Sequence, residues 1–157
     1  MGVEIERKYL LCSEAWRKDV ISSVAMEQGY LCENGTTVRV RLAGEKAFLT
    51  LKSSASGLAR TEYEYPIPPA DARYMLDNMC VGTNVKKIRH IVDAGNGLKW
   101  EIDEYLEENF PLFTAEIELP AADTAFEIPA WLGKEVSGDP SYTNRALSRN
   151  PYCRRIL

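Results

Sequence analysis

The sequence contains a single histidine, His90, and four cysteines that are spaced far apart, with no CxxC pair. Zinc sites and thiol–disulfide active sites both need closely spaced cysteine or histidine residues, so this sequence argues against both kinds of site. Widely separated cysteines outside a disulfide framework are typical of free thiols in a reducing compartment. We therefore expect four free thiols and a cytoplasmic protein.

Long hydrophobic runs are also missing. No segment approaches the roughly 20 apolar residues that a membrane-spanning helix needs. The first residues, MGVEIERKYLL, carry charges where a signal peptide would need an apolar stretch. The formal net charge is -4, without the basic excess that is typical of nucleic-acid-binding proteins. We expect a protein that binds neither membranes nor nucleic acids.

Turn signals divide the chain into short strands. Asn34-Gly35 and Asn96-Gly97 are the residue pairs that favour two-residue hairpins, and Gly44 marks a third turn. Around these turns, alternating or apolar segments predict eight strands. The expected strands cover residues 3–11, 30–32, 36–42, 47–53, 60–67, 85–93, 98–105 and 112–119. With 157 residues, we expect one domain over residues 1–157.

Helical patterns are fewer. Trp16, Val20 and Val24 recur every four residues, after a possible cap at Ser13, which predicts a helix that ends near Gly29. A second helix is predicted to begin at Pro69 and to run to residue 79, and a third covers residues 142–148. The fold class is therefore α+β and mainly antiparallel β.

Most of the predicted strands pair an apolar face with a charged face. Residues two apart in a strand share a face, and here like charges occupy such positions repeatedly. The bases are Lys8, Arg39, Arg41, Lys52, Lys87 and Arg89, and the acids are Glu4, Glu6, Glu62, Glu64, Glu101, Asp103, Glu116 and Glu118. In any one strand, a polar face in solvent explains the pattern. Taken together, such clusters repel each other unless opposite charges or ions lie between them.

If the apolar faces pack against helices outside, the charged faces close around a cavity. We therefore expect a closed eight-stranded β-barrel with the helices packed outside it. Carboxylates in such an interior suit hard cations such as Mg²⁺ or Mn²⁺, whereas arginine and lysine suit phosphoryl oxygens. The lining favours a complex of metal ions with a small-molecule triphosphate.

The same residues resemble a known family. Glu4-x-Glu6-x-Lys8 resembles the ExExK signature of the CYTH domain, the triphosphate tunnel metalloenzymes. Segments in the expected order follow it, namely TVRVRL, LTLKS, RTEYEYPI, WEID and AEIEL. The segment LGKEVS, together with Tyr142-x-Asn144, resembles the short bacterial members in particular. The resemblance runs over nearly the whole chain.

This resemblance implies roles for individual residues. It implies that the metal ions are held by Glu4, Glu6, Asp103, Glu116 and Glu118, and that the triphosphate is bound by Lys8, Arg39, Arg41, Lys52, Arg89 and Lys134. We add Lys87 to these bases because it shares a strand face with Arg89. Glu62 and Glu64 are expected to orient the bases, and Glu4 and Glu116 to accept the proton of the attacking water. His90, which faces away from Arg89, is expected on the outer face of the sheet.

Several functions stay open at this point. The compact chain and the segments WEID and GKEVS most resemble the bacterial inorganic triphosphatases, so the resemblance implies hydrolysis of inorganic triphosphate. We expect a monomer or a homodimer. The alternatives within the family are a class IV-type adenylate cyclase and a thiamine triphosphatase. Outside these enzymes, the chain can be a module that only binds polyphosphate, or a structural domain with solvated sheet faces. The role of Asn144, in anchoring a helix or in contacting the site, is also left open.

Overall fold

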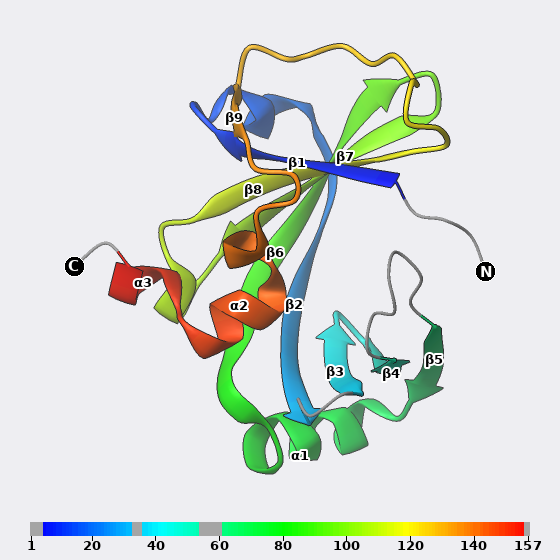
Figure 1. Cartoon of the computed structure of the whole chain (residues 1–157), viewed down its shortest axis with the longest axis vertical. Helices are drawn as coiled ribbons and strands as arrows, with labels where there is room; N and C mark the ends of the chain where they lie inside the picture. The colour runs from blue at the N-terminus through cyan, green and yellow to red at the C-terminus, as the bar shows by residue number, and fades with distance from the viewer. Residues whose placement is uncertain (1–4, 33–35, 54–60, 156–157) are drawn as a thin grey trace.

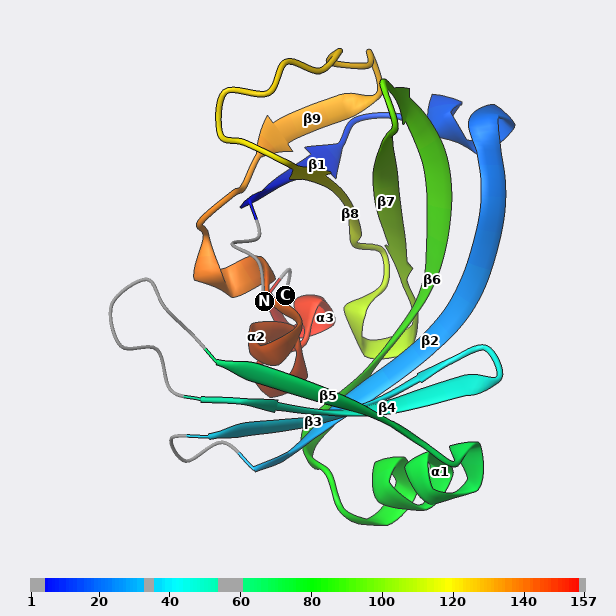
Figure 2. The same cartoon turned by 90° about the vertical axis from the view of Figure 1, so that its right-hand side faces the viewer.

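A single antiparallel sheet dominates the computed structural model, which describes residues 5–32, 36–53 and 61–155. Its strands run in the order β5-β4-β3-β2-β6-β7-β8-β1-β9. They are β1 (Ile5–Leu11), β2 (Val20–Cys32), β3 (Thr37–Ala43), β4 (Lys46–Lys52), β5 (Glu62–Ile67), β6 (Val81–Gly95), β7 (Leu98–Tyr105), β8 (Phe113–Leu119) and β9 (Leu132–Glu135). The sheet is strongly curved and encloses a space that is open on one side (Figures 1 and 2).

The predicted closed eight-stranded barrel is wrong. Within the described residues, the sheet has nine strands, and the outer edges of β5 and β9 pair with no further strand. Both edge strands are short, and β5 contains Pro66, whose missing N–H is tolerated at a sheet edge. The ninth strand, β9, was missed because its four residues, LGKE, are too few to show alternation.

The helix predicted from Ser13 to Gly29 is also wrong. This part of the chain forms a 3₁₀ turn, η1 (Ala15–Asp19), followed by the long strand β2. A spacing of four residues fits the alternation of a strand as well as the period of a helix. Val20, Ile21 and Val24 are β-branched and favour a strand. Pairing with β3 on one side and β6 on the other satisfies its backbone.

The other two predicted helices are confirmed, but they lie on opposite sides of the sheet. The first is α1 (Pro69–Asn78), which covers the convex side of β3 and β4 with Ala72 and Leu76. The second is α2 (Asn144–Arg149), which lies on the concave side and buries Leu147. The expectation that helices pack outside therefore holds for α1 and fails for α2.

The remaining short helices are η2 (Glu107–Asn109), η3 (Pro140–Tyr142) and α3 (Tyr152–Arg155). None of the helices in the described part of the chain combines the length and apolar character needed to span a membrane. The hairpin predicted at Asn96-Gly97 is confirmed, with φ angles of 54° and 77° that suit a tight two-residue turn. The turn predicted at Asn34-Gly35 lies outside the described residues.

The largest apolar core lies on the convex side of β1, β7 and β8. It is built around Trp16, Trp100 and Trp131, and it contains the outward-facing residues of β7 and β8. His90 faces this side, as expected, where its ring nitrogens contact Ser23 Oγ at 2.7 Å and a Glu104 oxygen at 2.9 Å. With the apolar residues facing outward, the charged residues of the same strands face the concave side.

Candidate functional site

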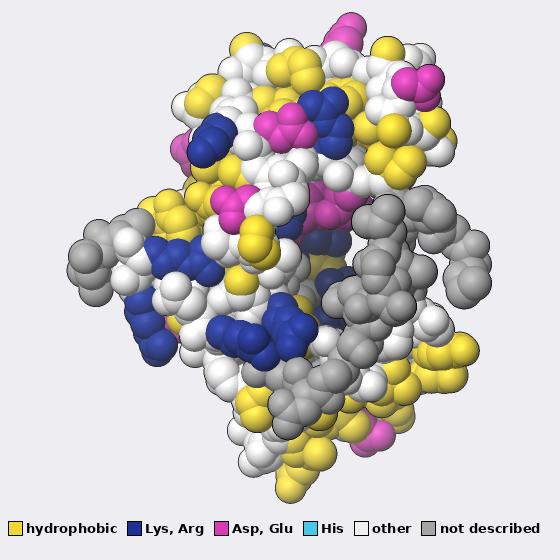
Figure 3. All heavy atoms as spheres, in the orientation of Figure 1, with side chains coloured by type: hydrophobic (Ala, Val, Ile, Leu, Met, Phe, Trp, Pro, Cys, Tyr) yellow, Lys and Arg dark blue, Asp and Glu magenta, His cyan; other side chains and the backbone are white. Residues whose placement is uncertain are grey.

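A pocket of about 440 Å³ occupies the concave side of the sheet. It is visible as a hollow that contains basic and acidic side chains side by side (Figure 3). Of the residues that the sequence predicted, it brings together Glu6, Lys8, Arg39, Arg41, Lys52, Glu62, Glu64, Arg89, Glu101, Glu116 and Glu118. The alternation of charges along the strands is therefore the pattern of a lining, because side chains two apart point into the same space.

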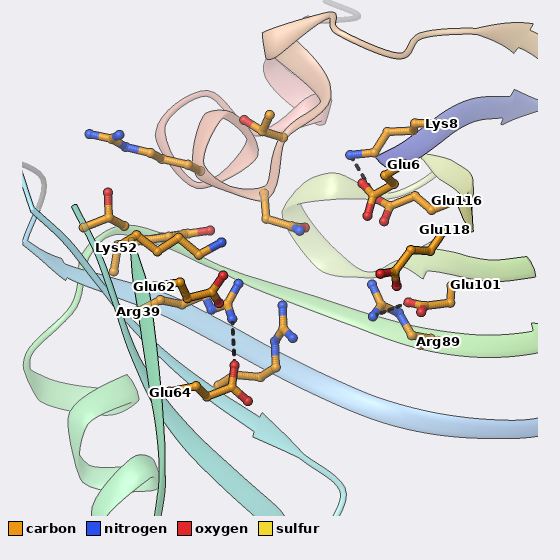
Figure 4. A pocket seen from close by; sticks show the side chains of 16 residues that line it. Glu6, Lys8, Arg39, Lys52, Glu62, Glu64, Arg89, Glu101, Glu116 and Glu118 are labelled. Carbon is orange, nitrogen blue, oxygen red and sulfur yellow. Dashed lines mark ion pairs between the residues drawn. The ribbon is translucent and has the colours of Figure 1, made fainter. Parts of the chain in front are cut away.

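The register aligns these residues in rows across the sheet. Thr50 lies between Arg39 and Glu64, and Lys52 lies between Thr37 and Glu62. At the other end of the sheet, Glu116 lies between Glu101 and Lys8. The two groups come from the two ends of the curved sheet and face each other across the pocket (Figure 4).

The end formed by β3, β4 and β5 is mainly basic. Arg39 donates to Thr50 at 3.2 Å and lies 3.9 Å from Glu64, and Arg41 donates to Gln28 at 3.0 Å. Burial, together with the nearby charges of Arg39 and Arg89, lowers the pKa of Arg41 to about 10. Since uncompensated positive charge contributes to this depressed pKa, an anion bound here would be stabilised.

The end formed by β1, β7 and β8 is mainly acidic. Lys8 Nζ lies 3.0 Å from a Glu116 oxygen, and Arg89 lies 2.6 Å from Glu101. Burial, and then the charge and hydrogen bond of Glu116, raise the pKa of Glu6 to about 7. Burial also raises the pKa of Glu101, although Arg89 opposes the shift. These carboxylates are crowded enough to repel one another, so a cation among them would be stabilised.

Beneath the pocket, three charged groups form a buried cluster. Asp103, which is 1% exposed, accepts from Lys87 Nζ at 2.7 Å and from Arg89 Nε and Nη2 at 2.8 and 2.9 Å. Burial by itself would raise the pKa of Asp103, but Lys87 and Arg89 hold it well below its usual range. Burial lowers the pKa of Lys87 to about 8 against the opposing effect of Asp103. The cluster fixes the guanidinium of Arg89 toward the pocket.

Not every predicted residue lies in the lining. Lys87 and Asp103 are buried behind Arg89, and Lys134 is exposed on the edge strand β9, apart from the pocket. Glu4, predicted as a metal ligand and proton acceptor, lies outside the described residues. The position of Lys134 depends on where β9 pairs, which its local sequence does not encode.

Sequence reasoning missed a group of uncharged and helical residues in the lining. These are Tyr30, Thr37, Thr143 and Arg145. Asn144, whose contact with the site was left open, lines the pocket as well. Tyr30 was missed because the strand predicted around it covered only residues 30–32, too few to show which face its side chain shares with others. Thr143, Asn144 and Arg145 reach the pocket because α2 lies on the concave side. The only signal for them was the Tyr142-x-Asn144 pattern.

Comparison with known proteins assigns the chain to a family, since the sequence profile of the CYTH domain matches residues 2–146. The chain belongs to the CYTH domain family. It is 41% identical to an inorganic triphosphatase of Acetivibrio thermocellus over 153 residues, 97% of each chain. It is 35% identical to an inorganic triphosphatase of Nitrosomonas europaea, over 92% of this chain and 96% of that one. A crystal structure of an inorganic triphosphatase superimposes with a TM-score of 0.74 and 33% identity, covering 94% and 95% of the two chains.

The acidic end of this CYTH domain has donor groups suited to a divalent cation. Glu6, Glu116 and Glu118 supply carboxylate oxygens, the donors that Mg²⁺ and Mn²⁺ prefer, to one end of the pocket (Figure 4). The described residues contain no group of three acidic, histidine or cysteine side chains already arranged to hold one ion. The raised pKa of Glu6 beside Glu116 would be relieved by a cation. The donor chemistry therefore fits, with Glu6 and Glu116 as the closest pair.

Proposed function

We propose that this protein hydrolyses a small-molecule triphosphate, with inorganic triphosphate as the preferred substrate. The observation that carries the proposal is the pocket itself, in which a basic end faces an acidic end across one cavity on the concave side of the sheet. Two relatives that match more than nine-tenths of the chain bear the name inorganic triphosphatase. A bare triphosphate carries charge along its whole length, which suits a lining with charged groups at both ends.

In this proposal, Arg39, Arg41, Lys52 and Arg89 bind the phosphoryl oxygens. Arginine forms forked, charge-assisted hydrogen bonds with such oxygens, and these bonds strengthen as charge grows on the leaving phosphate. Asp103 and Lys87 position Arg89 from behind, since both oxygens of Asp103 already accept hydrogen bonds. Lys134 is left out of the binding set because it is exposed outside the pocket.

The acidic end would hold Mg²⁺ or Mn²⁺ through Glu6, Glu116 and Glu118, and the resemblance adds Glu4 to them. When bound, a divalent cation neutralises phosphate charge and acidifies a water molecule. Glu116 is the proposed acceptor for the proton of the attacking water, and Lys8 at 3.0 Å holds its carboxylate in place. No covalent nucleophile is required, because phosphoryl transfer depends mainly on positioning and charge stabilisation.

The proposed setting is the cytoplasm. All four cysteines, Cys12, Cys32, Cys80 and Cys153, are free thiols, which suits a reducing compartment.

The test is phosphate release by the purified protein from inorganic triphosphate, ATP, thiamine triphosphate and pyrophosphate. Each substrate is assayed with Mg²⁺, with Mn²⁺ and with a chelator. We expect fastest turnover of inorganic triphosphate, loss of activity with the chelator, and loss of activity in Glu116→Gln. Glu14→Gln is the matched control, because it removes the same charge from an exposed side chain paired with Arg17.

Other outcomes would replace this proposal. Cyclic AMP and pyrophosphate formed from ATP, without phosphate release, would indicate a cyclase. Tight binding of inorganic triphosphate without any turnover would indicate a binding module. Activity that survives in Glu116→Gln at the level of Glu14→Gln would refute the proposed role of the acidic end.

A further inference from the structure

The short helix α2 is held rigidly on the concave side of the sheet. Leu147 is fully buried beside Val85, Tyr105 and Leu112. The Thr143 hydroxyl accepts from the backbone N–H of Ala146 at 3.1 Å and so caps the first turn. The residue that follows this cap, Asn144, is therefore presented to the pocket from a fixed backbone position.

The side chain of Asn144 contacts the buried charge cluster beneath the pocket. Its Oδ1 accepts from Lys87 Nζ at 3.3 Å and from the Tyr105 hydroxyl at 3.0 Å. Lys87 also donates to Asp103, which in turn holds Arg89. Asn144 is thus linked through a chain of hydrogen bonds to a guanidinium that lines the pocket.

These contacts settle which way the amide of Asn144 points. A lysine ammonium has no lone pair and can only donate, so the oxygen of the amide must face Lys87. The two ends of a carboxamide diverge, so the NH₂ group faces away from Lys87 and Tyr105. Asn144 is half-buried and lines the pocket, so this other side is the pocket.

We propose that Asn144 is a substrate-binding residue whose amide N–H donates to a phosphate oxygen while its carbonyl oxygen is locked by Lys87 and Tyr105. The inference rests on the proposed function in one respect, since it takes the ligand to be a triphosphate. It assigns α2 a direct part in recognition, in addition to its packing on the sheet.

An uncharged donor has a physical advantage at this position. The buried cluster behind it already contains two cations against one acid, Asp103, and a further cation would be repelled by them. An amide held at its oxygen donates without adding charge, and its orientation needs no rearrangement when the anion binds. The amide N–H therefore favours a ligand that presents a hydrogen-bond acceptor at this position, such as a phosphate oxygen, over a ligand that presents a hydrogen-bond donor there.

The experiment compares Asn144→Asp with Asn144→Ala at pH 7, where Lys87 is mainly an ammonium, using calorimetric binding of inorganic triphosphate and thermal unfolding. Asn144→Asp keeps an oxygen that can accept from Lys87 and Tyr105 but replaces the donor with a negatively charged oxygen. We expect it to retain the wild-type Tm and to bind inorganic triphosphate at least about tenfold more weakly, with KM raised more than kcat is lowered. Asn144→Ala should lose both thermal stability and affinity.

The matched control is Asn78→Asp, which makes the same change on α1, where the Asn78 amide donates to a backbone carbonyl on the exposed side. It should bind inorganic triphosphate as the wild type does. Wild-type affinity in Asn144→Asp would overturn the inference and leave Asn144 as an anchor of α2 only, with the proposed function intact. Binding that weakens in Asn144→Asp when the wild type shows no turnover would support the inference and refute the hydrolase. A wild type that does not bind inorganic triphosphate would overturn both.

Discussion

Replacing Asp103 by asparagine should destabilise the protein more than replacing its partner Lys87 by methionine. Asp103 is the only acid in contact with both Lys87 and Arg89 among the described residues, and it is 1% exposed. The asparagine side chain has nearly the same shape, but it would leave the buried Lys87 facing a neutral amide and Arg89 with Glu101 as its remaining acid. Lys87→Met instead leaves Asp103 with two hydrogen bonds from Arg89, at 2.8 and 2.9 Å.

The magnitudes follow from this asymmetry. Leaving a buried charge without its partner costs about 3–5 kcal/mol, which we expect for Asp103→Asn. Losing one hydrogen bond from a charge that keeps its other partner costs about 1–2 kcal/mol, which we expect for Lys87→Met. For a chain of this length, 1 kcal/mol corresponds to roughly 2–4 °C in Tm. Asp103→Asn should therefore lower Tm by roughly 6–20 °C, and Lys87→Met by a few degrees.

The stability that Lys87 contributes also depends on pH. The pKa of Lys87 is lowered from 10.5 to about 8 by burial, so between these values the unfolded chain holds a proton that the folded chain has lost. Stability therefore rises with pH across this window, and Lys87→Met should remove this contribution.

Urea denaturation at about pH 7, followed by tryptophan fluorescence, measures both variants, and a series from about pH 7.5 to 9.5 measures the slope. Equal or greater destabilisation by Lys87→Met would refute the reasoning, because it would mean that Arg89 does not compensate Asp103. If the free energy of unfolding rises with pH as steeply in Lys87→Met as in the wild type, the pH argument is refuted separately.

Three further predictions concern the pocket and the packing around it. Arg41→Ala should lower kcat/KM for inorganic triphosphate by roughly 10–100-fold, the effect of losing a charge-assisted hydrogen bond, measured by phosphate release. Glu6→Gln should remove a pH dependence: the pKa of Glu6 is raised from 4.5 to about 7, so its contribution to stability is present below pH 4.5 and is lost as pH rises through 7. At about pH 8, where this contribution has been lost, added Mg²⁺ should raise the Tm of the wild type and should raise the Tm of Glu6→Gln by less. Gly29→Ala should destabilise by about 1–3 kcal/mol in urea denaturation, because its new Cβ would lie 2.5 Å from Cys80 Sγ.

Each of these predictions has a control and an opposing result. Arg7→Ala, which removes an arginine paired with Glu135 on the outer side of β1, should leave kcat/KM unchanged. If Arg41→Ala behaves like Arg7→Ala, the basic end does not bind substrate. Identical pH profiles of Tm for Glu6→Gln and the wild type would show that Glu6 is not held among other acids. A Gly29→Ala variant as stable as the wild type would mean that Cys80 can move aside.

The charged lining was predictable because it depends on a local rule. Side chains two apart in a strand share a face, so Arg39 with Arg41, and Glu116 with Glu118, could be assigned to one side before the sheet was known. The hairpin at Asn96-Gly97 was equally local, because only a few residue types favour its backbone angles.

Other features depend on contacts between residues far apart in the chain. Whether residues 20–32 form a helix or a strand was decided by pairing with β3 and β6, which their own spacing does not encode. Whether Asp103 faces a ligand or two bases was decided by the register of β7 against β6, which brings it opposite Arg89.

The sequence by itself thus determined the family, the antiparallel strands and the residues that share the charged face, because each follows from local order or from a matching pattern. Only the tertiary structure decided that the sheet stays open between β5 and β9, that α2 enters the concave side with Asn144 and Arg145, and that Lys134 stays outside the pocket. The physical reason is that closure of the sheet, burial and strand pairing depend on which distant segments meet. Alternation along a strand assigns side chains to one face, but it does not determine what that face contacts.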